Sequence, residues 1–94
     1  MKDRSRSDEL NRQLLDRMER ITGQTRGILR MIEEERYCID ILIQIGAVKG
    51  ALNQVALQLF EDHSRHCLTS SLAQGGEQQE EAIQELITAL KRML

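Results

Sequence analysis

The chain has no proline, and its aliphatic residues recur every three or four positions over most of its length. Leu10, Leu14, Met18 and Ile21 begin this pattern, which is the spacing of one face of an α-helix. Apolar residues make up 40% of the sequence, yet there is one Phe, one Tyr and no Trp. Because strands favour aromatic and β-branched residues, this composition favours helices. We predict an all-α fold.

The first helix is expected at about residues 8–34. Ser7 can cap its N-terminus, and Asp8 and Glu9 place negative charge where the helix dipole favours it. The charged, Ser-rich residues 1–7 are predicted to form a flexible arm.

A second helix is expected from about Cys38 to about residue 72, and a third over residues 77–93. Gln74-Gly75-Gly76 separates them, since glycine ends helices readily. Apolar residues of the second helix are too many for one narrow stripe, which predicts burial on more than one side. Residues 8–94 should therefore form a single helical domain.

A chain of 94 residues is near the lower limit for a stable independent core, so we expect oligomerisation. There is no apolar run near 18 residues and no charged-then-apolar leader, which predicts a cytoplasmic protein without a membrane span. In that compartment both cysteines should be reduced thiols.

The net charge of −2 conceals an uneven distribution. Residues 1–30 carry eight basic side chains against five acidic ones, whereas residues 31–94 carry five against ten. A basic segment on an acidic protein suggests an anionic partner such as double-stranded DNA, although a solvated helix face would also explain it. The candidates for phosphate contact are Arg17, Arg20, Arg26, Arg30 and Lys49.

His63 and Cys67 lie four residues apart, which places them one turn apart on one helix face. This is a suitable arrangement for two ligands of one metal ion. The only other thiol, Cys38, lies 25 residues before His63 in the same predicted helix. At a rise of about 1.5 Å per residue the separation is roughly 37 Å, so one chain cannot bring them together. Either the three residues are unrelated or the site is shared between two chains.

Two copies of the second helix that pack antiparallel about a two-fold axis would bring the three residues together. A crossing near residue 51 or 52 places Cys38 of one chain level with residue 65 of its partner. Gly50 and Ala51 lie at that crossing and allow close approach. Such a dimer would hold two identical sites, each with Cys38 from one chain and His63 and Cys67 from the other.

Two thiolates and one imidazole form a soft, three-coordinate donor set that suits copper(I). Zinc usually takes a fourth ligand, and nickel prefers more nitrogen donors. Taken alone, Cys38 would more often be a small buried apolar residue, and His63 a surface residue. His66 lies beside the ligand face and is expected to be solvated.

The run from Arg20 to Glu33, followed by Tyr37-Cys38 and by Asp40 to Ile45, resembles the copper-sensitive operon repressor family. His63-x-x-x-Cys67 and the region from Gly75 to Leu86 extend this resemblance over about residues 11–91. It implies a three-helix protomer, an antiparallel four-helix-bundle dimer core and a dimer of dimers.

The same resemblance implies a transcriptional repressor that releases operator DNA when its effector binds. Cys38, His63 and Cys67 match the copper(I) branch of that family, in which Tyr37 and Glu85 correspond to residues near the metal-binding histidine. Arg17 and Lys49 are the basic residues that the family pattern favours for DNA contact.

Three alternatives remain open at this stage. A repressor that senses reactive sulfur would need only the dithiol of Cys38 and Cys67. A copper buffer would bind the metal but not DNA. A thiol enzyme would need a cleft and an acid–base partner for its nucleophile; the pattern offers only His63 near Cys67, so we predict that the protein is not an enzyme.

Overall fold

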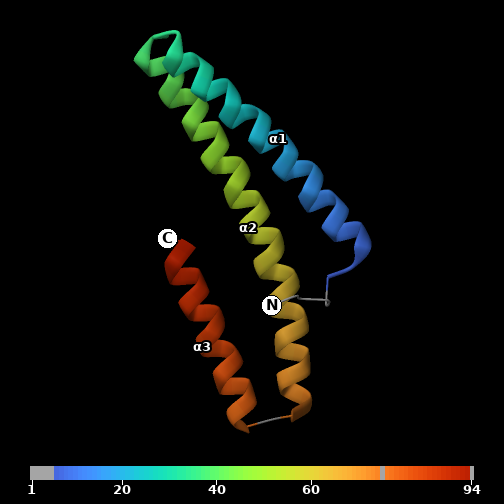
Figure 1. Cartoon of the computed structure of the whole chain (residues 1–94). Helices are drawn as coiled ribbons and strands as arrows, with labels where there is room; N and C mark the ends of the chain where they lie inside the picture. The colour runs from blue at the N-terminus through green and yellow to red at the C-terminus, as the bar shows by residue number, and fades with distance from the viewer. Residues whose placement is uncertain (1–5, 75, 94) are drawn as a thin grey trace. The chain divides into compact units, whose positions relative to one another are not determined.

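The protein consists of three helices, α1 (Asp8–Glu33), α2 (Cys38–Gln74) and α3 (Gly76–Met93) (Figure 1). The computed structural model describes residues 6–74 and 76–93, without the side chains of residues 67–74, 78 and 93. Within these ranges there is no strand. The all-α, three-helix prediction is confirmed, with boundaries within two residues of those expected.

The chain divides into two compact units, and the division falls inside α2. One unit spans Ser7–Val55 and contains α1 and the first part of α2. The other contains Arg6 and the chain from Ala56 onward, including the rest of α2 and α3. The single-domain assignment of residues 8–94 stays a prediction.

Ser7 caps α1 as predicted. Its backbone is extended, with φ −69° and ψ 156°, and its hydroxyl accepts a hydrogen bond of 3.1 Å from the Leu10 amide. Asp8 and Glu9 occupy the first turn, and Glu9 also pairs with Arg12 at 2.7 Å. The cap satisfies an amide that would otherwise have no partner in the first turn, which fixes where α1 begins.

The turn between α1 and α2 depends on an unusual backbone conformation at Glu35. This residue has φ 54°, in the left-handed region that favours glycine. The Glu35 amide donates to the Ile32 carbonyl at 3.1 Å, and the Arg36 amide donates to the Met31 carbonyl at 2.9 Å. These two bonds form a Schellman motif, which ends the helix and satisfies two of its last carbonyls.

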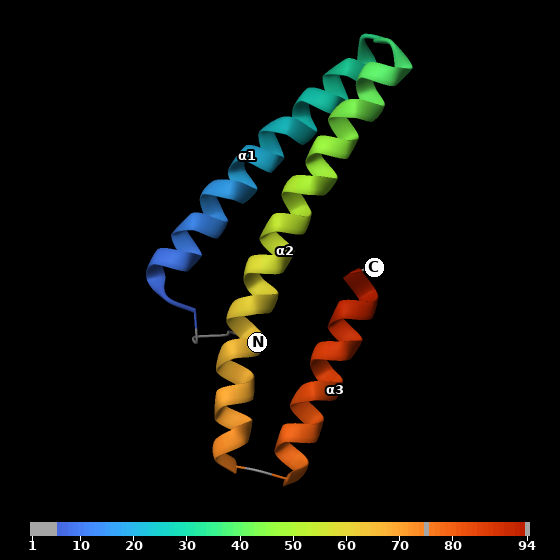
Figure 2. The same ribbon diagram turned by 180° about the vertical axis from the view of Figure 1, so that it is seen from behind.

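In the Ser7–Val55 unit, α1 lies alongside the first part of α2 (Figures 1 and 2). Leu14, Ile21 and Val55 form the buried core of this unit, and three half-buried apolar residues, Leu10, Val48 and Ala51, pack against it. This core is small for a helix pair of such length. Much of the aliphatic surface predicted from the sequence is therefore left uncovered within one chain.

In the second unit, α3 lies alongside the C-terminal part of α2 in both views (Figures 1 and 2). Ala82 and Leu86, one turn apart on α3, are buried, whereas Ile87 and Leu90 remain more than one-third exposed. The pattern is that of an amphipathic helix with its apolar stripe on one side. Gly76 begins α3 with φ +51°, a conformation that an L side chain would disfavour.

Replacing Glu35 by glycine should stabilise the protein. A side chain in the left-handed region costs about 1–2 kcal/mol, which exceeds the entropy cost of glycine of about 0.5–1 kcal/mol. We expect Glu35→Gly to raise the free energy of unfolding by up to about 1 kcal/mol in chemical denaturation at a fixed protein concentration.

The matched control is Glu34→Gly, one residue earlier, where φ is −84° and a side chain is tolerated. That substitution should leave stability unchanged or lower it. Equal destabilisation by both substitutions would contradict the role assigned to Glu35.

Candidate metal centre

All three predicted metal ligands belong to α2, which is helical without interruption from Cys38 to Gln74. Cys38 is the first residue of the helix, and His63 lies 25 residues later. Cys67 belongs to the same helix, but its side chain lies outside the described residues. The premise that one continuous helix separates Cys38 from the other two positions is therefore correct.

Cys38 is a free and exposed thiol. Helix α2 begins at this point because the amides of Asp40 and Ile41 both donate to the Tyr37 carbonyl, at 3.1 and 3.3 Å. Tyr37 itself is 69% exposed. Neither side chain is packed against its own unit, so Cys38 is not a buried apolar residue within the single chain.

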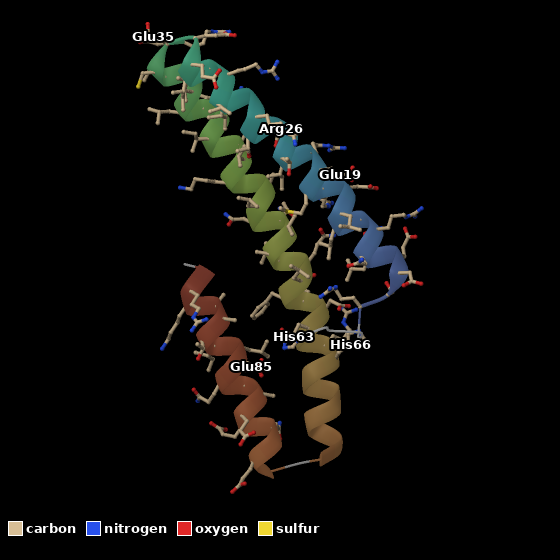
Figure 3. The ribbon with its side chains drawn as sticks, viewed as in Figure 1. Glu19, Arg26, Glu35, His63, His66 and Glu85 are labelled. Atoms are coloured by element: carbon tan, nitrogen blue, oxygen red, sulfur yellow. The ribbon has the colours of Figure 1, made fainter. Side chains whose placement is uncertain are left out.

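His63 is half-buried on α2 and projects toward α3, which carries the exposed Glu85 (Figure 3). Both residues belong to the same compact unit, and Glu85 lies at about the same level as His63 in this view. Burial and a neighbouring helix restrict the orientation of the imidazole, as a histidine ligand requires.

A set of residues from Cys38 to His63 recurs at the spacing of one helix face. From Cys38, successive positions are alternately four and three residues apart, which is the heptad spacing of a helix that packs along another helix. We call this set the α2 seam; it comprises Cys38, Leu42, Ile45, Lys49, Leu52, Ala56, Leu59 and His63.

The large aliphatic residues of the α2 seam are exposed in the single chain. Leu42 is 55% exposed, and Ile45, Leu52 and Leu59 are each more than one-third exposed. The heptad spacing of the α2 seam is present in the sequence, but apolar residues on the other faces of α2 made it hard to recognise. Two of the predicted ligands thus lie at the ends of an uncovered apolar face.

The described part of one chain does not bring the predicted copper ligands together. No group of three or more His, Cys, Asp or Glu side chains lies close enough among the residues described, a search that does not include the Cys67 thiol. The residues present nevertheless fit copper(I), because the exposed Cys38 thiol and the restrained His63 imidazole are soft or borderline donors.

The family model described as "Metal-sensitive transcriptional repressor" matches residues 10–92. The chain belongs to this family. The copper-sensing transcriptional repressor CsoR of Bacillus subtilis (strain 168) is 48% identical over 80 residues, which are 85% of this chain and 77% of that protein.

Two solved structures of metal-responsive regulators have similar folds. The copper-sensing repressor CsoR with Cu(I) from Geobacillus thermodenitrificans NG80-2 superposes with a TM-score of 0.84 and 40% identity, covering 98% of this chain and 92% of that chain. The nickel-responsive transcriptional regulator InrS has a TM-score of 0.77 and 37% identity over the full length of both chains. The two neighbours are thus named for responses to different metal ions.

A repressor of this family needs a surface for DNA, and the five predicted basic residues are all exposed. Within the part of the chain that the structure describes, none of the five forms an ion pair with a carboxylate. This differs from Arg12 and Arg36, which pair with Glu9 and Glu34. Lys49 belongs to the α2 seam, so a helix that covers the seam would compete with DNA for this side chain.

Within the described part of one chain, no other helix packs closely against the glycines of α1 and α2. Among the described residues, no atom outside the local helix lies within 4 Å of a Cβ placed at Gly23, Gly27, Gly46 or Gly50.

None of the described helices is long and apolar enough to cross a membrane.

Proposed function

We propose that this protein is a cytoplasmic, copper(I)-responsive repressor that binds operator DNA when metal-free and releases it when copper(I) is bound. The observation that carries the proposal is the donor set: two thiols and one imidazole on a single helix of a metal-sensitive repressor. The relatives whose names specify copper support the same metal. A nickel response is less favoured, because the chain has no histidine before His63 to supply further nitrogen donors.

The proposed site lies between two chains. An antiparallel pair of α2 helices would bury the aliphatic residues of the α2 seam against their copies, which removes apolar surface from water. With the crossing near residue 51, the same pairing brings Cys38 of one chain to His63 and Cys67 of the other. The homodimer thus explains the uncovered seam and the separated ligands together, and two such dimers would form the proposed homotetramer.

Each residue has a defined task in this proposal. Cys38 and Cys67 would bind copper(I) as thiolates and His63 as a neutral imidazole, and the bound ion would link two chains. Tyr37 and Glu85 would orient the imidazole of His63. Arg17, Arg20, Arg26 and Arg30 would neutralise DNA phosphates, and Lys49 would do so only where the paired α2 helices leave its ammonium group exposed.

The affinities for copper(I) and for DNA are coupled by thermodynamic linkage. If the dimer arrangement that binds copper(I) binds DNA poorly, then DNA must weaken copper binding by the same factor. The strongest alternative effector is a reactive sulfur species, because Cys38 is exposed and a second thiol is present in the chain. A copper buffer without DNA binding is less favoured, since the exposed basic residues would then have no partner.

The effector is tested by His63→Ala. Copper(I) should weaken operator binding by the wild-type protein by about 5- to 150-fold, the usual range of allosteric coupling. The variant retains both thiols, so its metal-free form should bind DNA normally but no longer respond to copper(I) in a fluorescence-anisotropy titration. Release of the wild type by a persulfide donor but not by copper(I) would instead assign it to sulfur sensing.

The shared site is tested with mixed dimers of Cys38→Ser and a His63→Ala/Cys67→Ser double variant. Neither protein alone has a complete inter-chain site. After unfolding and refolding together, about half of the dimers are mixed and each has one complete site, so the mixture should bind about one copper(I) per four chains. A mixture that binds no more tightly held copper(I) than its two components would exclude the shared site.

The DNA surface is tested by Arg17→Ala. Without this guanidinium, binding to all DNA sequences should weaken, and the slope of log K against log salt should fall by about 0.9 for each phosphate that is no longer neutralised. Arg12→Ala is the control, because Arg12 is paired with Glu9 at 2.7 Å. Equal effects of the two substitutions would contradict a direct role for Arg17.

A further inference from the structure

A second pair of potential metal ligands lies on α2 beside the proposed copper site. Asp62 and His66 are one turn apart, and the Asp62 Oδ1 and His66 Nε2 atoms are separated by 3.4 Å. The Asp62 side chain is 20% exposed and that of His66 is 49% exposed. Figure 3 shows His66 on a different part of the helix surface from His63, which projects toward α3.

Asp62 is poorly satisfied by the residues that the structure describes. Its Oδ2 atom is buried and has no hydrogen-bond partner among them. The Oδ1 atom pairs with His66 at a distance longer than the 2.7–3.2 Å of a good N–H···O bond. A largely buried carboxylate without good donors is unfavourable, and such a group often indicates a missing ion or water.

A second hydrogen-bond acceptor on the same face of α2 also lacks a donor within the described part of the chain. Gln58 lies one turn before Asp62, and its Oε1 atom is also buried and unpartnered among the described residues. The positions 58, 62 and 66 therefore form a line of side chains that can all donate electron pairs. A bound cation would satisfy several of these atoms at once, whereas a hydrogen-bond donor would satisfy one or two.

The separation of the two ligand atoms is suitable for a divalent ion. Zinc bound to nitrogen and oxygen has bond lengths of about 2.0–2.2 Å, and tetrahedral angles then place neighbouring ligand atoms about 3.3–3.5 Å apart. The observed 3.4 Å agrees with this value. The distance between these two atoms is therefore compatible with both of them binding one such ion.

We propose that Asp62 and His66 form a second metal site, selective for divalent ions of the zinc and cobalt class and separate from Cys38, His63 and Cys67. An oxygen and a nitrogen donor suit these borderline ions, whereas copper(I) favours thiolates. Gln58 and water supply the remaining ligands. Two classes of metal ion are then bound by neighbouring faces of the same helical turn.

Cobalt(II) is the probe, because its visible d–d absorption reports binding and its sulfur-to-metal charge transfer reports thiolate ligands. The full-length, reduced wild-type protein should show d–d bands without charge transfer. Asp62→Asn and His66→Gln should each weaken cobalt(II) binding by about 10- to 100-fold and leave copper(I) affinity unchanged.

Two further variants keep the test specific. Glu61→Gln removes the same charge from the neighbouring exposed residue and should bind cobalt(II) like the wild type. His63→Ala should lose copper(I) but retain cobalt(II), and circular dichroism of every variant checks that α2 remains helical. The proposal is overturned if cobalt(II) shows thiolate charge transfer, if Asp62→Asn binds it normally, or if Asp62→Asn weakens both metals equally.

Discussion

The main constraint on this protein is that the exposed apolar residues of the α2 seam must be buried by another helix. A helix of 37 residues is stable in water only when neighbouring helices bury its apolar surface, and α1 covers little of it. The buried cluster of the Ser7–Val55 unit consists of three residues, while aliphatic side chains along the α2 seam remain in solvent. Apolar area of this extent is typical of a protein interface. Folding and assembly are therefore expected to be one process rather than two.

Much of the fold could be predicted from local chemistry. The boundaries of α1 follow from Ser7 as a cap and from aliphatic spacing, and α3 follows from its single apolar stripe. The left-handed conformation of Glu35 in the turn between α1 and α2 could not be predicted, because the sequence has glutamate where such a residue is usually glycine. The stabilising hydrogen bonds of that turn are made by the backbone, so side-chain identity carries little information about them.

The candidate ligands could be proposed from the sequence, whereas their surroundings required the structure. Soft donors at a spacing of four residues indicate a metal site regardless of fold, and a continuous helix makes a shared site the simplest solution. The exposure of Cys38 and the poorly satisfied carboxylate of Asp62 required the structure. His66 was expected to be solvated because it lies beside the ligand face, and its pairing with Asp62 one turn away became visible only in the structure.

The length of α2 between Cys38 and His63 has a consequence for how the protein can change. Twenty-five residues correspond to almost seven turns at 3.6 residues per turn, so an ideal helix would place these two positions on nearly the same face. Inserting or deleting one residue between them would rotate one donor by about 100° relative to the other and break the heptad phase. Substitutions can accumulate on the rest of α2, but gaps in this interval would separate the seam from its ligands. Related sequences should therefore differ in this segment by substitutions and not by insertions or deletions.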